Sequence, residues 1–159
     1  MATILAYLAQ VPKSTLASGP TPKDGMPTCL RVYCPNARCK CLILRQGDGT
    51  FVSKRDVPFD IPALPAGTVP TATVDNDRNV DALPSDEADA LYIEVRDMMH
   101  FENIGFSKTV ADGLKFLSCA DCDLGPLGFQ QIGPNVYGGC FVKADRVRYQ
   151  LVSAVTSPQ

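Results

Sequence analysis

Two cysteine pairs are the residues of this sequence best suited to metal chemistry. Cys119 and Cys122 form a C-x2-C pair, and Cys34 and Cys39 form a C-x4-C pair far upstream. A tetrahedral zinc ion, with Zn–S distances of about 2.3 Å, needs two thiolates from one tight turn, and spacings of two to four residues allow this. Two such pairs complete a four-cysteine site. Because four thiolates leave no open position for water, we expect one structural Zn²⁺ rather than a catalytic one.

The remaining cysteines leave part of this assignment open. The chain has seven cysteines, so a scaffold held only by disulfides would leave at least one thiol over. Cys41 is a rival to Cys34 or Cys39, although C-x-C is shorter than an ordinary zinc knuckle and Cys41 begins an apolar run. For the second pair the alternative is a redox C-x-x-C, which usually needs a βαβ setting that this segment lacks. Cys29 and Cys140 are typical of buried thiols.

Few other groups in the sequence are suited to catalysis. His100, the only histidine, lies between Met99 and Phe101 in a strand-like run, where we expect a packed or edge residue. A single histidine excludes a catalytic metal site built from several histidines of this chain. The G-x-x-x-x-G-K-[ST] and G-x-G-x-x-G motifs are absent, so nothing predicts a nucleotide cradle. Acidic residues around the second pair form either a solvated face or a binding surface: Glu94, Asp97, Glu102, Asp121 and Asp123.

Composition and charge narrow the function classes further. A chain of 159 residues with 45% hydrophobic and 20% charged residues is typical of one globular domain. Its net charge of −2 provides no basic footprint for nucleic acid or an anionic membrane. The apolar N-terminus lacks the basic region of a secretory signal, and no apolar run reaches the roughly 18 residues of a spanning helix. We therefore expect a cytoplasmic protein without direct membrane insertion. As a separate expectation, the chain is a monomer.

Proline sets the expected domain organisation. Ten of the thirteen prolines fall in two stretches, which excludes long helices and central strands there. We expect a flexible N-terminal tail over residues 1–27 and a flexible proline-rich insertion over 56–88. Residues 28–153 should form a single zinc-binding β domain that contains this insertion, and 154–159 a second tail.

The elements that must position the cysteines are predicted to be strands. Runs rich in β-branched and aromatic residues predict five of them: 91–95, 98–101, 114–118, 136–142 and 146–151. In the last of these, Arg146, Arg148 and Gln150 alternate with apolar residues, which predicts one solvated face.

Two further local signals come from turn and cap residues. Residues 42–44 and 51–52 flank Gln46–Gly49, a turn with two glycines, and together they predict a β-hairpin. Ser85 and the acidic residues that follow it predict one short helix over 85–90. The fold class is therefore mainly β.

The segments that surround the second cysteine pair resemble a known protein family. Asp97–Lys108, followed by Leu114–Phe129, closely resembles the Rab-interacting factor family, the "mammalian suppressor of sec-four" proteins and their yeast counterpart. The match combines F-E-N-[hydrophobic]-G-F with a C-A-D-C knuckle and a G-P-[hydrophobic]-G turn. It is specific over 92–129 and looser over 29–55 and 136–150.

The resemblance implies a β-rich fold in which both cysteine pairs share one zinc ion. It also implies binding of Rab GTPases in vesicular transport, promotion of GDP release and stabilisation of the nucleotide-free form, as an exchange factor or chaperone without bond-making chemistry. Glu102, Asn103 and Phe106 either contact the partner or shape the loop. The partner-binding residues carried over are Asp97, Met98, Glu102, Asn103, Phe106 and Asp121.

The chain also departs from the family pattern at three places. The C-x4-C spacing resembles fungal members more than the C-x2-C animal form, Phe129 stands where we expect tryptophan, and the proline-rich insertion is particular to this chain.

The alternative function is that of a zinc enzyme resembling B-type methionine sulfoxide reductases, with Cys140 as nucleophile. No neighbouring His or Arg-rich signature marks a lowered pKa for the Cys140 thiol.

Overall fold

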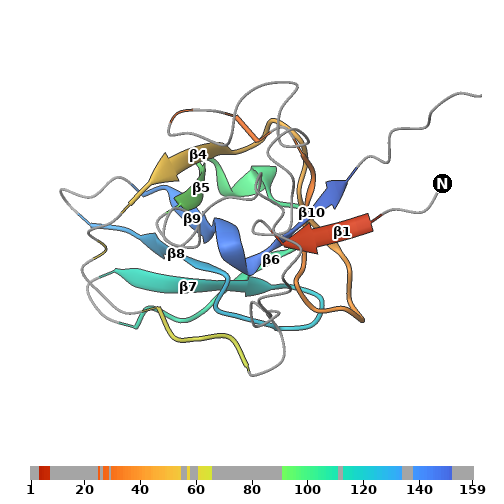
Figure 1. Ribbon diagram of the computed structural model, residues 1–159. Helices are drawn as coiled ribbons and strands as arrows, with labels where there is room; N and C mark the ends of the chain where they lie inside the picture. The colour runs from red at the N-terminus through yellow and green to blue at the C-terminus, as the bar shows by residue number, and fades with distance from the viewer. Residues whose placement is uncertain are drawn as a thin grey trace, which may run out of the picture.

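The computed structural model describes residues 4–7, 25, 27–28, 30–54, 57, 61–65, 91–110, 113–133 and 138–151. Within these residues the strands form two antiparallel sheets (Figure 1). The four-stranded sheet has the order β1 (Ile4–Tyr7), β10 (Arg148–Leu151), β2 (Val32–Tyr33) and β3 (Leu42–Leu44). The six-stranded sheet has the order β4 (Thr50–Ser53), β5 (Leu91–Val95), β9 (Cys140–Lys143), β8 (Gly128–Gln131), β7 (Leu114–Cys119) and β6 (Ile104–Phe106).

The mainly β fold expected from the sequence is confirmed. The helical elements of the described residues are two short 3-10 turns, η2 (Met98–His100) and η3 (Ala144–Arg146). In this part of the chain we find no helix with the length and apolar character that a membrane crossing requires.

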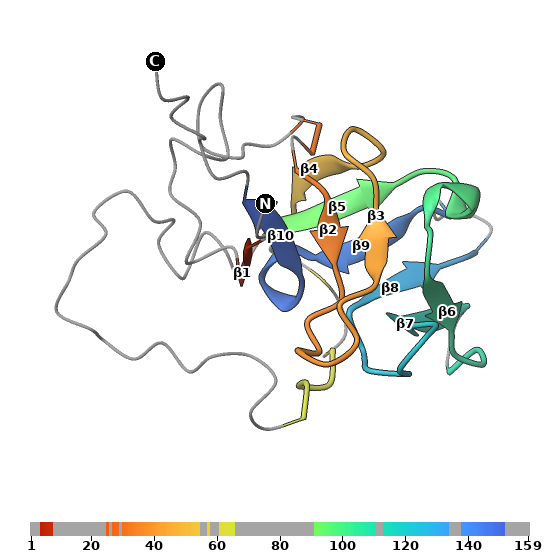
Figure 2. The same cartoon turned by 90° about the vertical axis from the view of Figure 1, so that its right-hand side faces the viewer.

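The core lies between the two sheets (Figure 2). The two-residue period of a strand places alternate side chains on opposite faces, and β5 shows both faces in use. Ile93 and Val95 belong to the cluster shared with Val32, Ile43 and other residues of the four-stranded sheet. On the opposite face of the six-stranded sheet a second apolar cluster consists of Tyr92, Leu114, Phe129 and Phe141. The six-stranded sheet is therefore apolar on both faces, which explains why its strands carry few charges.

The predicted strands 42–44 and 51–52 exist, but the hairpin between them was wrong. They are part of β3 and β4, which lie in different sheets. The connecting turn is bound to Thr28 instead: Gly47 N–H donates to the Thr28 carbonyl, and Thr28 N–H donates to the Gly49 carbonyl, both at 2.8 Å. A Cβ on Gly49 would collide with a methyl of Ile93, so only glycine lets the chain pass this close to β5.

The strand predicted over 98–101 was wrong at residues 98–100, which form a turn, whereas Phe101 is extended and makes an antiparallel bridge with Leu44. Asp97 accepts a hydrogen bond from the Met99 N–H at 2.9 Å, and His100 N–H donates to the Asp97 carbonyl at 3.0 Å. This side-chain cap starts η2 and competes with an extended backbone. His100 is consequently exposed on the turn rather than packed in a strand.

The other predicted elements have mixed outcomes. Residues 91–95 and 114–118 lie in β5 and β7 as expected, and Cys140–Val142 of the predicted strand 136–142 lies in β9. Residues 136–137 and the helix predicted over 85–90 are outside the described residues. At the C-terminus, 144–146 forms η3 and 148–151 forms β10. The expected solvated face of this strand was wrong at Arg148, which is buried.

Parts of two segments predicted to be flexible pack against the domain. Ile4–Tyr7, within the expected tail, forms β1 and pairs with β10. In the expected insertion, Leu64 packs against the main core. The Arg146 guanidinium donates to the carbonyls of Pro62 at 2.7 Å and Pro126 at 2.8 Å, so it ties the start of the insertion to the loop before β8.

Candidate metal centre and adjoining surface

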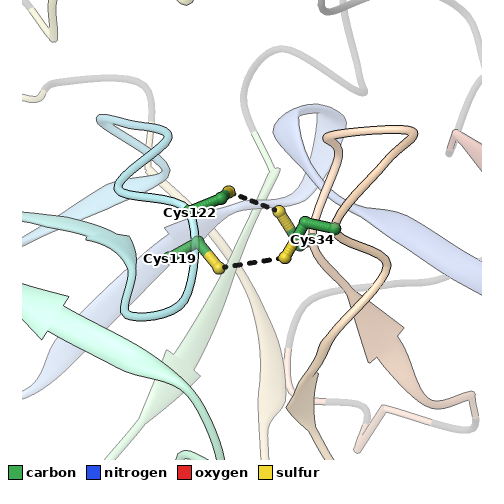
Figure 3. A group of neighbouring side chains, drawn as sticks. Cys34, Cys119 and Cys122 are labelled. Atoms are coloured by element: carbon green, nitrogen blue, oxygen red, sulfur yellow. Dashed lines mark hydrogen bonds between the residues drawn. The ribbon is translucent and has the colours of Figure 1, made fainter.

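Four thiols from two distant loops converge at one point. Cys34 directly follows β2, Cys119 ends β7, and the Sγ atoms of Cys34, Cys39, Cys119 and Cys122 all lie within 4.8 Å of one another. Figure 3 shows Cys34 of the first loop and Cys119 and Cys122 of the second pointing toward each other. The Sγ separations are 3.6 Å for Cys34–Cys122 and 3.8 Å for Cys39–Cys119. Zn–S bonds of about 2.3 Å give a tetrahedron edge of about 3.8 Å, so this donor set fits a four-thiolate metal ion.

The two loops bend in the same way after their second cysteine. Lys40 follows Cys39 with φ of 54°, and Asp123 follows Cys122 with φ of 59°. Left-handed backbone is uncommon for residues other than glycine, and within the described residues these are the two non-glycine cases. The repeat of this rare conformation at matching positions indicates that Cys39 and Cys122 play equivalent parts in their loops.

Matching hydrogen bonds close the two cysteine loops and show which residue of the second loop corresponds to Cys41. The Cys34 N–H donates to the Cys41 carbonyl at 2.9 Å, and the Cys119 N–H donates to the Leu124 carbonyl at 2.9 Å. In each loop the acceptor lies two residues beyond the second cysteine of the pair. Cys41 is therefore the counterpart of Leu124, and both side chains pack against the core.

Cys41 nevertheless lies beside the thiol cluster. Its Sγ is 3.2 Å from the Sγ of Cys119, which is shorter than the edge of a zinc–thiolate tetrahedron. It is not a member of the four-thiol group. The geometry therefore favours Cys34 and Cys39 as partners of the second pair, and the identity of the ligands stays a prediction.

The protonation of these thiols depends on burial and on nearby donors. Burial raises the pKa of Cys34, Cys39 and Cys41. Burial also acts to raise the pKa of Cys119, but hydrogen bonds from the Cys122 backbone N–H and the Cys41 thiol outweigh it and lower the pKa to about 7. Buried thiols lose their protons readily only when a cation stabilises the thiolates, which is the usual state of metal-binding cysteines.

Cys140 is not part of the cluster. Cys140, in β9, is 1% exposed, and burial raises its thiol pKa to about 11. A protonated, inaccessible thiol is a poor nucleophile, so the reductase alternative loses its candidate residue. The expected buried state of Cys140 is confirmed, whereas Cys29 lies outside the described residues.

Next to the cysteine loops, residues 97–106 present two methionines to solvent. Met98 is 47% exposed and Met99 is 81% exposed on η2, and no residue of that turn is buried. Asp97 is exposed and caps the turn. The family resemblance carried over Met98 but not Met99, whose exposure becomes visible only in the structure. The Asp97 cap was the available signal for a turn.

Glu102 and Asn103 hold this segment in place. Asn103 Nδ2 donates to the Leu42 carbonyl at 2.8 Å, and the Asn103 carbonyl accepts from the Ala120 N–H at 3.1 Å. It therefore connects β3, the segment 97–106 and the second cysteine loop. The Glu102 carboxylate forms an ion pair with Arg45 at 2.7 Å. These contacts favour a loop-shaping part for both residues.

The last two predicted partner-binding residues differ in exposure. Phe106, in β6, is half-buried and packs against the main core. Asp121 is exposed in the second loop, and its Oδ2 accepts a hydrogen bond from the Cys39 thiol at 3.2 Å. Phe129, which stands where we expected tryptophan and is not one of the predicted partner-binding residues, is buried. Its ring stacks on that of Phe141 with centroids 5.2 Å apart. The exposed members of the predicted set are therefore Asp97, Met98, Glu102 and Asp121, whereas Asn103 and Phe106 are half-buried.

Comparison with known proteins agrees with the resemblance found in the sequence. A family model described as Mss4 protein matches residues 28–149, which contain both cysteine pairs and the segment 97–106. The chain is 39% identical over 109 residues to a Drosophila melanogaster protein named "Guanine nucleotide exchange factor MSS4 homolog". That match covers 69% of this chain and 76% of the fly protein. A Schizosaccharomyces pombe protein of the same name is 39% identical over 51 residues, which are 32% of this chain and 50% of that protein.

Proposed function

Because the chain belongs to the Mss4 family, we propose that it is a guanine nucleotide exchange factor for Rab GTPases in vesicular transport. It binds the GTPase as a monomer in the cytoplasm, promotes GDP release and stabilises the nucleotide-free form. The fly and fission yeast relatives carry the exchange-factor name, which supports the first part of this proposal. The family resemblance supports Rab proteins as the partner.

Linkage explains how such a factor works without bond-making groups. If it binds the empty GTPase more tightly than the GDP-bound form by some factor, it must weaken GDP binding by the same factor. Catalysis of exchange then needs only a surface that complements the empty state. Acidic and apolar side chains are suited to this, because the phosphate-binding loop of a GTPase is basic and becomes accessible when the nucleotide leaves.

The observation that carries the proposal is the exposed pair Met98 and Met99 beside an acidic cysteine loop. Large exposed apolar side chains on a soluble domain often mark a binding site, and methionine adapts to varied partner surfaces. The Asn103–Ala120 hydrogen bond joins their segment to the loop that carries Asp121. The segment and the loop thereby offer apolar contact and negative charge to one partner.

In this proposal the metal holds the surface together. One Zn²⁺ bound by Cys34, Cys39, Cys119 and Cys122 would link the loop after β2 to the loop after β7. The second loop carries Asp121 and is in turn bonded to Asn103. The ion has a structural part, and the exchange activity belongs to the protein surface around it.

The first test is exchange itself. Each member of a panel of Rab proteins, loaded with labelled GDP, is mixed with the zinc-loaded chain, and GDP release and complex formation are followed together. We expect faster release and a stable nucleotide-free complex with at least one Rab, and addition of excess GDP should dissociate that complex because the two ligands compete by linkage. No acceleration and no complex with any Rab would refute the proposed function.

A second test isolates the charge of the second cysteine loop. Asp121→Asn should slow stimulated GDP release roughly tenfold, about 1.4 kcal/mol, because the neutral amide no longer complements a basic loop. Asp123→Asn is the matched control, since Asp123 is exposed in the same loop and asparagine tolerates its left-handed backbone. Zinc content is measured for both variants. If Asp121→Asn stimulates release as well as wild type with zinc unchanged, charge complementarity at this residue is wrong.

A further inference from the structure

Arg148 is a buried cation directed at the first cysteine loop. It lies on β10 opposite Tyr33, the residue before Cys34, and it is 8% exposed. Its Nε and Nη2 both donate to the Cys34 carbonyl, at 3.1 Å and 2.8 Å, and Nη2 also donates to the Asn36 carbonyl at 3.0 Å. The ion pairs within the described residues do not involve Arg148. Its known partners are therefore neutral backbone carbonyls.

Arg148 binds a part of the first cysteine loop that has no counterpart in the second, because C-x4-C is two residues longer than C-x2-C. Lys40 N–H donates to the Asn36 carbonyl, four residues back, as Asp123 N–H donates to the Cys119 carbonyl. Asn36 thus has the backbone position that the ligand Cys119 has in the second loop. The first ligand of the longer loop, Cys34, lies two residues further upstream.

The guanidinium of Arg148 spans this two-residue extension. Its donors reach the carbonyls of Cys34 and Asn36, one at each end of the added step, and the Cys34 N–H is held by the Cys41 carbonyl. Both backbone polar groups of Cys34 are therefore fixed, which orients its Sγ toward the other thiols. A buried arginine with a planar fork of donors is suited to this, because one side chain can bind two carbonyls in a fixed geometry.

The hydrogen bonds to the Cys34 and Asn36 carbonyls also bring the charge of Arg148 to the first cysteine loop. A buried guanidinium is unfavourable without compensating charge, whereas four thiolates around a divalent ion carry a net charge of −2. We propose that Arg148 is a positioning residue of the metal centre: it orients the first cysteine pair and compensates the negative charge of the metal-bound thiolates. This inference depends on the four-cysteine metal site and is independent of the Rab proposal.

The test measures metal affinity in the full chain. Zn²⁺ is titrated against a chromophoric chelator, and Co²⁺ absorption reports the thiolate geometry independently. Arg148→Met should bind Zn²⁺ roughly 10- to 100-fold more weakly, as for other groups that orient metal ligands, and should alter the Co²⁺ spectrum. Arg148→Lys keeps the charge without the planar fork, so its affinity should fall between those of Arg148→Met and wild type.

Arg146→Met is the matched control. Arg146 is also a partly buried arginine near β10 that donates to backbone carbonyls, those of Ile61, Pro62 and Pro126, but none belongs to a cysteine loop. We expect it to lower the thermal midpoint with zinc affinity within about threefold of wild type, since the metal ligands keep their support.

Each result has a defined meaning. Wild-type zinc affinity in Arg148→Met, or an equal loss in Arg146→Met, would overturn the proposal. If Arg148→Met does not fold, Arg148→Lys decides by the same comparison, and wild-type affinity in that variant overturns it. If the wild-type chain itself binds no Zn²⁺, the metal site fails instead, whatever the outcome of the GDP-release experiment.

Discussion

Cys39→Ser should lose the bound zinc and destabilise the domain, whereas Cys41→Ser should retain one zinc per chain. The serine hydroxyl is a poor replacement for a thiolate, so the site would fall to three ligands. Metal that binds only the folded state stabilises it by about 4 kcal/mol when free metal is about 1,000 times the dissociation constant. Loss of this stabilising free energy should lower the thermal midpoint of unfolding strongly. Metal content per chain and thermal unfolding, with and without a chelator, measure both effects.

The contrast rests on the matched backbone of the two loops. Cys39 precedes the left-handed residue Lys40 as Cys122 precedes Asp123, while Cys41 takes the apolar position of Leu124. Cys41→Ser should therefore cost only about 1 kcal/mol, the usual effect of a polar change at a half-buried position. If Cys41→Ser loses zinc and Cys39→Ser keeps it, the first pair is Cys34 with Cys41, and the comparison of the loops is misleading.

Met98→Asp should reduce stimulated GDP release by at least about 30-fold and abolish a stable complex with the nucleotide-free Rab. A central apolar contact of an interface is worth about 2 kcal/mol or more, and the new carboxylate adds a desolvation penalty. The domain should remain folded, because η2 contains no buried residue. GDP release from a responsive Rab gives the rate, and size-exclusion chromatography shows whether the complex forms.

The control for this change is an equally exposed apolar residue elsewhere. Ile132 is 52% exposed, close to the 47% of Met98, and it follows β8, away from η2 in sequence. Ile132→Asp should leave both GDP release and zinc content near wild type. If Met98→Asp is as active as wild type, η2 is not part of the binding surface. An equal loss in Ile132→Asp would place the surface elsewhere or show that added negative charge is harmful in general.

The convergence of the four cysteines was largely predictable, because its main signal is local. A C-x2-C pair can present two thiols from one turn whatever surrounds it, and the second pair, Cys34 and Cys39, offers the same possibility. The choice between Cys39 and Cys41 was not decided by spacing. Hydrogen bonds to loop carbonyls and the left-handed backbone at Lys40 distinguish them, and both depend on how the loop folds against its neighbours.

The sequence by itself determined the class of fold, two candidate ligand pairs and the family, since these follow from proline distribution, residue period and motif spacing. Strands such as β5 and β7 were predictable because their apolar side chains suit burial on a sheet. Only the tertiary structure decided that β3 and β4 separate into two sheets and that Arg148 is buried against the first cysteine loop. Pairing and burial depend on contacts between residues far apart in the chain, such as Thr28 with Gly47 and Arg148 with Cys34, and a local pattern contains no information about such contacts.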